Sequence, residues 1–315
     1  MKQLTREQTA EFLKENDSFV ILTHRRPDGD TLGSSALLCR GLRKLGKTAH
    51  ILTNPETTEK YAHLHEGLTT EQVADGDILI SVDVASKGML PEAFSVYADR
   101  ISLRIDHHAT ADSFTQMELV EADAAACGEL IATVFSLMGV RLDKPMANAL
   151  YTAISTDTGC FRYANTTAKT LECAAHCAYN SDELFAINQA LFNTYSLGRL
   201  RIQGYLIENA IFLQEGKAVI CALPKAVEEA YGVTEDDLDN ISGFPRSIEG
   251  VKIAATLREE GKNRIKISVR AVPGYDAAAI CQKFGGGGHK GAAGASMQMS
   301  MNEAVEAIKE AMSKI

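Results

Sequence analysis

Four short apolar stretches in the first half of the chain predict buried β-strands. They are residues 18–23, 47–53, 77–82 and 101–105. Strands that read as nearly continuous apolar runs are typical of sheets that are covered on both faces. Between the first two stretches, Leu38, Leu42 and Leu45 recur at helical spacing, and Gly46 follows them as a C-cap. The succession of strand, helix and strand predicts an α/β fold with a doubly wound, mainly parallel sheet.

Helical patterns follow, and a second strand-rich region comes after them. The predicted helices carry stripes at Cys127, Leu130, Val134 and Met138 and at Met146, Leu150 and Ala153, and further helices cover 167–179 and 182–192. The C-terminal region predicts strands at 217–222, 251–257 and 264–269, a helix at 275–284 and a last helix at 301–315 with the stripe Val305, Ile308, Met312 and Ile315. We therefore predict a first domain at 1–194, a helical connector at 195–212 and a smaller α+β domain at 213–315.

Length, charge and cysteine content narrow the function. A chain of 315 residues exceeds the usual size of one core, which agrees with two domains. Its net charge of −9 disfavours long-range capture of long nucleic acid, and it lacks Trp residues on which bases could stack. The charged N-terminus and the absence of a long apolar run predict no signal peptide and no membrane span. Seven cysteines without framework spacing indicate reduced thiols and a cytoplasmic location.

One cysteine cluster could be interpreted as half of a zinc site. It consists of Cys173, His176 and Cys177, which lie in a segment that reads as a helix. Because no second pair stands at zinc spacing, small buried thiols are the favoured interpretation.

Acidic and imidazole side chains follow the predicted strands, where a doubly wound sheet places its active site. They are His24, Asp28 and Asp30 after the first strand, Asp83 after the third, Asp106, His107 and His108 after the fourth, and Asp157 at the end of a helical stripe. Each motif alone is compatible with an ordinary turn, cap or loop histidine. Together they indicate a metal site, because carboxylates mixed with imidazole suit Mn²⁺ or Mg²⁺. Asp157 should point inward, where a metal ion would compensate its buried charge.

A glycine-rich segment, FGGGGHKGAAGAS at 284–296, lies in the second domain. Glycines allow close approach of the main chain to a phosphate, and His289 and Lys290 can add positive charge. The segment lacks the Gly-Lys-Ser/Thr ending of a P-loop and follows a helix instead of a strand, which excludes the Rossmann motif. A flexible hinge and a phosphate-binding segment both remain compatible with this pattern.

The motifs HRRPDGD, VD, DHH, TDTG and GGGGHKGAAG, in this order and spacing, resemble those of the DHH phosphoesterase superfamily. Within it the chain is most similar to the bacterial nanoRNase/pAp-phosphatase group, over nearly its whole length. The resemblance implies a DHH metal-binding catalytic domain, a DHH-associated substrate-binding domain and an active site in the cleft between them. It also implies a two-metal phosphodiesterase and phosphatase that hydrolyses short oligoribonucleotides, 3′-phosphoadenosine 5′-phosphate (pAp) or both to mononucleotides.

The resemblance also assigns residues by position. It implies one metal ion held by His24, Asp28 and Asp83 and another held by Asp30, Asp83, His107 and Asp157. Asp83 would bridge the ions, Asp106 would orient a histidine ring and His108 would face the phosphate, so these three form the catalytic set. Substrate contacts fall on Gly286, Gly287, Gly288 and His289, with Arg270 and Arg162 as further candidates.

Two Mn²⁺ ions are the expected cofactors, with Mg²⁺ or Co²⁺ as alternatives, and a homodimer remains open. The rival functions are a RecJ-like exonuclease, a linear or cyclic dinucleotide phosphodiesterase, a pyrophosphatase or exopolyphosphatase, and a nucleotide-binding regulatory module without turnover.

Overall fold

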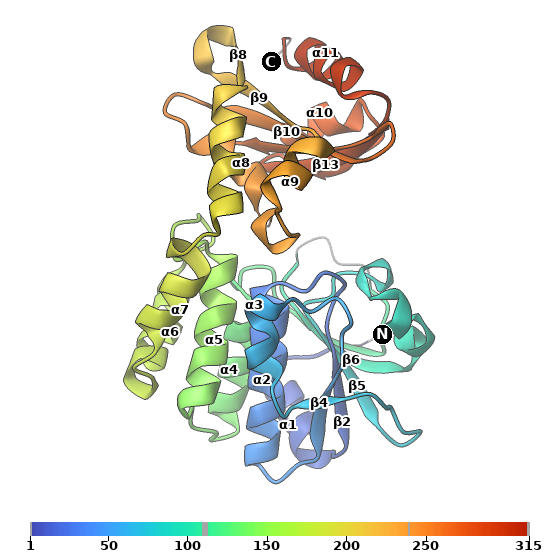
Figure 1. Cartoon of the computed structure of the whole chain (residues 1–315). Coiled ribbons are helices and arrows are strands. Elements are labelled where there is room, and N and C mark those ends of the chain that lie inside the picture. The colour runs from blue at the N-terminus through green and yellow to red at the C-terminus, as the bar shows by residue number, and fades with distance from the viewer. Residues whose placement is uncertain (1, 109–112, 239, 314–315) are drawn as a thin grey trace. The chain divides into compact units, whose positions relative to one another are not determined.

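The computed structural model describes residues 2–108, 113–238 and 240–313. The chain divides into two compact units, Met1–Thr194 and Tyr195–Ile315, which are described separately (Figure 1). Ile315, the last member of the predicted C-terminal stripe, lies outside the described residues. Within the described ranges, no helix combines the length and the apolar character that crossing a membrane requires.

The N-terminal unit is built on a seven-stranded sheet in which all paired strands are parallel. Its order is β1-β7-β6-β5-β2-β3-β4. The strands are β1 (Lys2–Gln3), β2 (Phe19–Leu22), β3 (Ala49–Leu52), β4 (Thr69–Thr70), β5 (Ile78–Val82), β6 (Ile101–Asp106) and β7 (Met117–Val120). The four predicted strands correspond to β2, β3, β5 and β6, so the predicted fold class is confirmed, while the short strands β1, β4 and β7 were not predicted.

Helices cover this sheet on both faces. They are α1 (Arg6–Glu15), α2 (Gly29–Lys44), α3 (Glu59–Ala62), α4 (Cys127–Leu137), α5 (Lys144–Asp157), α6 (Ala168–Asn180) and α7 (Leu184–Asn188), with the 3-10 turns η1 (His63–His65), η2 (Lys87–Met89) and η3 (Glu92–Arg100) and the π-helix η4 (Gln189–Asn193). Along β2, Phe19 and Ile21 face the core under α2, α4 and α5, whereas Val20 and Leu22 face the core under η3. This alternation explains why β2 is apolar at every position.

Glycine lets the helices that carry the site approach each other closely. A Cβ atom at Gly33 of α2 would lie 2.5 Å from the carbonyl oxygen of Ala149 in α5. A Cβ atom at Gly128 of α4 would lie 2.8 Å from the Cβ of Ala153, also in α5. The helices α2, α4 and α5 therefore form one closely packed layer, which fixes the side chains at their ends.

The C-terminal unit contains a six-stranded sheet of order β12-β13-β11-β10-β9-β8. Its strands are β8 (Ile211–Leu213), β9 (Ala218–Leu223), β10 (Ile253–Gly261), β11 (Arg264–Ala271), β12 (Gly287–His289) and β13 (Ala292–Gln298). The strands β9 and β10 are parallel and the other pairs are antiparallel. Its helices are α8 (Leu197–Glu208), α9 (Lys225–Tyr231), α10 (Ala277–Gln282) and α11 (Met301–Met312), with the 3-10 turns η5 (Gln214–Gly216), η6 (Asp236–Leu238) and η7 (Ile241–Ser247).

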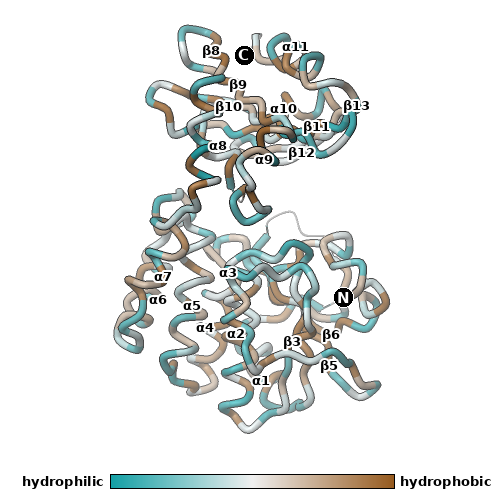
Figure 2. Tube along the Cα trace, viewed as in Figure 1, coloured by the Kyte–Doolittle hydropathy of each residue, from teal (hydrophilic) through white to brown (hydrophobic). Residues whose placement is uncertain are grey.

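One face of this second sheet packs on α10 and α11, and α8 and η7 contribute to the core on part of the other face. Hydropathy follows this arrangement, with apolar segments gathered at the strands of both units (Figure 2). Along β11 and β13 buried and accessible residues alternate, so the face that does not meet α10 and α11 is open to solvent there.

Candidate metal centre

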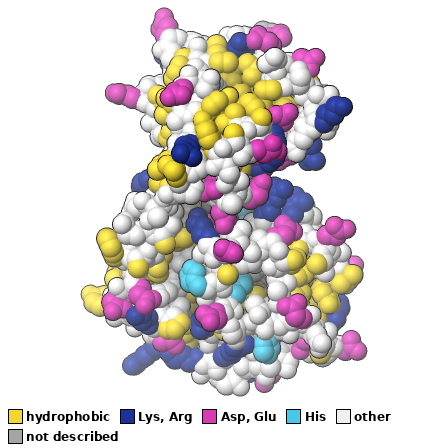
Figure 3. All heavy atoms as spheres, in the orientation of Figure 1, with side chains coloured by type: hydrophobic (Ala, Val, Ile, Leu, Met, Phe, Trp, Pro, Cys, Tyr) yellow, Lys and Arg dark blue, Asp and Glu magenta, His cyan; other side chains and the backbone are white. Residues whose placement is uncertain are grey.

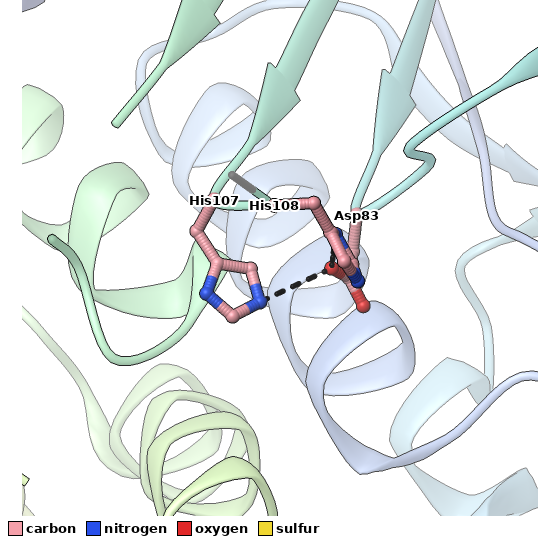
Figure 4. Close-up of side chains that lie close together, drawn as sticks. All are labelled: Asp83, His107 and His108. Carbon is pink, nitrogen blue, oxygen red and sulfur yellow. Dashed lines mark ion pairs between the residues drawn. The ribbon is translucent and has the colours of Figure 1, made fainter. Parts of the chain in front are cut away.

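Three adjacent parallel strands, β6, β5 and β2, end at the same edge of the N-terminal sheet. His24 follows β2, Asp83 follows β5, and Asp106, His107 and His108 stand at the end of β6. Figure 4 shows His107 and His108 of one strand end turned toward Asp83 of the next. Because carboxyl ends of parallel strands share one edge, motifs far apart in the sequence meet here.

Asp83 lies between two histidines. Its Oδ2 atom is 3.6 Å from Nε2 of His24, and its Oδ1 atom is 3.5 Å from Nε2 of His107. The first side is completed by Asp28, whose Oδ1 lies 3.6 Å from Nε2 of His24. The second side is completed by Asp30 and Asp157, whose Oδ2 atoms lie 3.6 Å and 3.2 Å from Nε2 of His107. Two sets of ligand atoms thus form, each within 4.8 Å: His24 with Asp28 and Asp83, and Asp30 with His107 and Asp157. Asp83 also forms such a group with His107 and His108, and another with Asp30 and Cys127.

The main chain at Asp83 is left-handed, with a φ of 61°. Non-glycine residues rarely adopt this conformation, and it persists where neighbours impose it. Here the Asp83 N–H donates to the carbonyl of Ile105 at 2.9 Å, and the Thr31 hydroxyl donates to the carbonyl of Val82 at 2.8 Å. These bonds hold the Asp83 side chain at the shared edge of β5 and β6.

Main-chain carbonyls orient the two central imidazoles. Nδ1 of His24 lies 2.7 Å from the carbonyl oxygen of Arg25, and Nδ1 of His107 lies 3.1 Å from that of Ala124. A proton on each Nδ1 leaves Nε2 as the ligand atom that faces the carboxylates. This arrangement is typical of histidines that bind metal ions.

Helix α4 holds the fully buried Asp30 carboxylate. The Cys127 N–H donates to Oδ2 at 2.7 Å, the Gly128 N–H donates to Oδ1 at 3.2 Å, and the Ser34 hydroxyl donates to Oδ1 at 2.6 Å. The free amides at the start of α4 thus receive a carboxylate from α2 in place of a side-chain cap of their own.

Without a metal ion, the carboxylates of this cluster depend on bound protons to balance their charge. Burial opposes ionisation of Asp83, but hydrogen bonds from His107 and His24 outweigh it and hold the pKa of Asp83 below its ordinary value. Burial and the charge of Asp83 raise the pKa of Asp30 to about 7, and burial and the charge of Asp30 raise the pKa of Asp157 to about 9.

The residues fit a pair of divalent metal ions. In the described part of the chain, neither Asp30 nor Asp83 has a lysine or arginine within ion-pair distance, although both are buried. Buried carboxylates of this kind need a compensating cation. Imidazole nitrogens mixed with carboxylate oxygens are donors that Mn²⁺ and similar ions accept.

Asp106 does not face the two ligand sets directly. It is fully buried, and its Oδ1 accepts the main-chain N–H of His107 at 2.8 Å and lies 2.7 Å from Nδ1 of His108. On the other side, Oδ2 lies 3.5 Å from Nη1 of Arg104. The hydrogen bond that His108 donates to Asp106 raises the pKa of His108, although burial opposes this shift. The ring of His108 is therefore oriented by Asp106 and remains 38% exposed.

Asp157 ends α5 and is followed by a left-handed turn. Gly159, Cys160 and Phe161 have φ values of 56°, 58° and 62°. Asn165 donates to the carbonyl of Asp157 at 3.1 Å and ties this turn to the end of the helix. The Asp157 side chain faces His107, in the inward direction predicted from the helical stripe. It is 27% exposed and therefore only partly buried. Arg162, one of the substrate candidates, is exposed in the same turn, where its Nε donates to the carbonyl of Gly159 at 2.6 Å.

In the C-terminal unit, residues 287–289 of the glycine segment form the edge strand β12, and residues 292–296 belong to its neighbour β13. Strand register pairs Arg270 with Ala292 and Ala292 with His289, so the three residues form one row across β11, β13 and β12. Directly paired residues in antiparallel strands point to the same face. Arg270 and His289 therefore flank a strip of small residues on the open face of this sheet. A Cβ atom at Gly286 would lie 2.2 Å from the carbonyl of Gly294, which explains the requirement for glycine there.

Two features of the site escaped the sequence interpretation. Arg104 is only 1% exposed and pairs with Glu118 at 3.0 Å as well as with Asp106. The amides of Cys127 and Gly128 that hold Asp30 were also not identified. The signal that could have revealed Arg104 is a single arginine between Leu103 and Ile105 in the buried strand ISLRID. Cys173, His176 and Cys177 belong to none of the potential metal-binding groups among the described residues.

Comparison with known proteins places this geometry in a family. The model of the DHH family, N-terminal domain, matches residues 18–154, and the model of the DHHA1 domain matches residues 217–314. The chain is 33% identical to the bifunctional oligoribonuclease and PAP phosphatase NrnA of Thermus thermophilus over 96% of this chain and 92% of that protein. It is 27% identical to the protein of the same name from Bacillus subtilis over 89% of this chain and 90% of that protein.

A solved structure shows the same fold. The crystal structure of an exopolyphosphatase-related protein from Bacteroides fragilis matches with a TM-score of 0.88, at 24% identity over 98% of this chain and 96% of that chain.

Proposed function

Since this chain belongs to the DHH family of phosphoesterases, we propose that it hydrolyses phosphate esters of short oligoribonucleotides and of pAp to mononucleotides. The observation that carries the proposal is the position of Asp83, whose two oxygens face His24 on one side and His107 on the other. A shared carboxylate between two ligand sets is the arrangement that a two-metal phosphoesterase requires.

The two sets assign ligands to the ions. His24, Asp28 and Asp83 would hold one ion, and Asp30, Asp83, His107 and Asp157 would hold the other, with Mn²⁺ favoured by the mixed donors. When bound, the ions supply Lewis acidity, which lowers the pKa of water and neutralises charge on the phosphoryl oxygens. Asp28 has a second task, because it caps α2 by accepting the amides of Asp30 and Thr31. It therefore fixes the position of Asp30 as well as its own.

His108 and Asp106 act on the substrate side of this centre. Asp106 accepts a hydrogen bond from Nδ1–H of His108, and Nε2 of that ring remains available to donate to a phosphoryl oxygen. The hydrogen bond to Asp106 raises the pKa of His108 and so favours the protonated ring, whose positive charge would stabilise the negative charge of the transition state. Arg162, exposed in the turn after Asp157, is the second candidate for this role.

Binding of the remaining nucleotide is assigned to the C-terminal unit. Gly286, Gly287, Gly288 and His289 would contact the substrate from β12, and Arg270 would contact it from β11. The small side chains of Ala292 and Gly294 leave the main chain open to a flat ligand. On the face drawn in Figure 3, lysine and arginine side chains are interspersed with acidic ones and do not form a stripe. This distribution and the net charge of −9 favour short substrates over long nucleic acid.

The cysteines support a reducing, cytoplasmic compartment. All seven are free, and all except Cys160 are buried. Cysteines that remain free thiols are typical of proteins in a reducing compartment.

A substrate panel tests the proposal. Purified protein with Mn²⁺ would be offered pAp, RNA dimers to pentamers, an RNA 20-mer, a cyclic dinucleotide and pyrophosphate at equal concentration. We expect the highest kcat/KM for pAp or the short RNAs, and fragments that shorten from one end would establish exonuclease action. A preference for the 20-mer, the cyclic dinucleotide or pyrophosphate would replace the proposal by one of the rival activities. Nucleotide binding without phosphate release would indicate a regulatory module.

A further inference from the structure

Two adjacent arginines, Arg25 and Arg26, lie in the turn between His24 and Asp28. Both side chains are exposed, and neither guanidinium group forms a hydrogen bond or an ion pair with another described residue. Other cations of this edge are neutralised, since Arg104 pairs with Glu118 and Lys87 pairs with Asp99. The turn therefore presents two positive charges that no described carboxylate compensates.

Neighbouring segments hold this turn in one conformation. The Arg25 N–H donates to the carbonyl of Met89 at 2.7 Å, and the Arg25 carbonyl lies 2.7 Å from Nδ1 of His24. The Arg26 N–H donates to Oε2 of Glu56 at 3.0 Å. Glu56, the carboxylate in contact with the turn, is thus engaged by the main chain and not by a guanidinium group.

The main chain of Arg26 is left-handed, with a φ of 48°. Glycine or asparagine would adopt this conformation more readily than arginine. Strain that the surroundings impose on a single residue is concentrated at sites that bind ligands. The left-handed main chain at Arg26 is therefore a second feature of this turn, besides its two uncompensated charges, that is common at ligand-binding sites.

The chemistry of the adjacent metal centre suggests which ligand the two arginines would bind. Four carboxylates, those of Asp28, Asp30, Asp83 and Asp157, occupy the centre, and metal ions held there would neutralise only the phosphate under attack. Any further phosphate of the substrate needs a separate cation, and the planar guanidinium group matches phosphate geometry. Because His24 directly precedes Arg25 and Asp28 follows Arg26 by two residues, a phosphate bound by the arginines would lie within one or two nucleotides of the metal centre.

We propose that Arg25 and Arg26 form a binding site for a substrate phosphate other than the one that is hydrolysed. This inference rests on the proposed function and adds a determinant of substrate length to it. Substrates with a second phosphate, such as a tetraribonucleotide or pAp, gain affinity from the pair. A dinucleoside monophosphate such as ApA, which carries only the reacting phosphate, does not.

The variants Arg25→Ala, Arg26→Ala and the double variant test the site. We expect KM for a tetraribonucleotide to rise roughly tenfold in each single variant, with kcat within about twofold and with ApA kinetics unchanged. The dependence of log Kd on log salt should become shallower by about 0.7 in the double variant, since each phosphate neutralised on a single strand contributes about 0.7 and the two arginines share one phosphate. The left-handed main-chain conformation at position 26 is equally unfavourable for alanine and for arginine, so the substitution should preserve the fold.

Arg141→Ala is the matched control. Arg141 is exposed and precedes α5, whereas Asp157 ends that helix of 14 residues, which places the control about 20 Å from the centre. Its kinetics should equal those of the wild type. Equal losses on ApA and on the tetramer, a loss confined to kcat, or no change in the double variant would each overturn the inference.

Binding separates this inference from the proposed function. Fluorescence anisotropy with a labelled phosphorothioate tetramer reports the arginine site even if the wild type hydrolyses none of the offered substrates. Absent turnover with an arginine-dependent Kd would contradict the proposed function alone. Normal turnover together with a Kd that is the same in the wild type and in the double variant would contradict the arginine site alone.

Discussion

Oδ1 of Asp106 lies 2.7 Å from Nδ1 of His108, and this hydrogen bond fixes which nitrogen of the ring faces the substrate side of the centre. Asp106 itself is fully buried and stands beside Arg104. The His108 ring is thus the exposed end of a chain of charged groups that runs from Glu118 through Arg104 and Asp106.

Asp106→Asn should reduce kcat roughly 100-fold or more, because the amide neither holds the same tautomer of His108 nor stabilises its positive charge. KM should change little, and metal content measured by mass spectrometry should stay at the wild-type value. The control is Asp99→Asn, which removes an exposed carboxylate of the same unit. A kcat within a few-fold of the wild type would contradict the role of Asp106.

Arg104→Met should lower the free energy of unfolding by about 3–5 kcal/mol, because it leaves Glu118 buried without its partner. The double variant Arg104→Met/Glu118→Gln should recover part of this loss, since the amide carries no charge. Urea unfolding measures both values. A single-variant loss below about 1 kcal/mol would show that the buried pair does not stabilise β6 and β7.

Stability without metal should fall as pH rises from 6 to 8. Burial and neighbouring charge raise the pKa of Asp30 to about 7 and that of Asp157 to about 9. Burial opposes protonation of His24 and His107, but their carboxylate neighbours raise the pKa of each to about 11. All four groups bind protons more tightly in the folded chain than in the unfolded chain, where their pKa values are about 3.9 and 6.5, so stability declines with pH.

Metal binding should reverse this trend, because the ions displace the protons and their affinity rises with pH. Thermal unfolding at pH 6, 7 and 8, with EDTA and with Mn²⁺, measures the effect, and calorimetry in buffers of different ionisation enthalpy measures the released protons. A metal-free chain whose Tm rises over this range, or metal uptake without proton release, would contradict the charge assignment.

His289→Ala should raise KM for short RNA about tenfold and leave kcat nearly unchanged, since the residue is assigned to binding and not to the reacting phosphate. Asn302→Ala on α11 is the control, because α11 packs on the opposite face of the sheet. A fall in kcat with unchanged KM would move His289 from substrate binding to chemistry.

The parallel sheet and the edge where its charged residues meet could be predicted from the sequence. The apolar runs of β2, β5 and β6 are unambiguous, and parallel strands bring the residues after them together. The sequence could not predict that residues 287–289 of the glycine segment form a strand. Their pairing with β13 depends on main-chain hydrogen bonds between small residues and not on a side-chain pattern. Strand β7 was not predicted, because Glu118 interrupts its apolar run. Only the folded structure shows that Glu118 pairs with the buried Arg104.

Metal stoichiometry of Asp83→Ala tests the two-metal centre most directly. Calorimetric titration of the metal-free wild type with Mn²⁺ should show two ions per chain, and Asp75→Ala, which removes an exposed carboxylate, should show the same. Asp83→Ala should lose the tight binding of both ions together with hydrolysis of pAp and short RNA, because each ligand set loses an oxygen of the same carboxylate. Two tightly bound ions and retained turnover in Asp83→Ala would contradict the account.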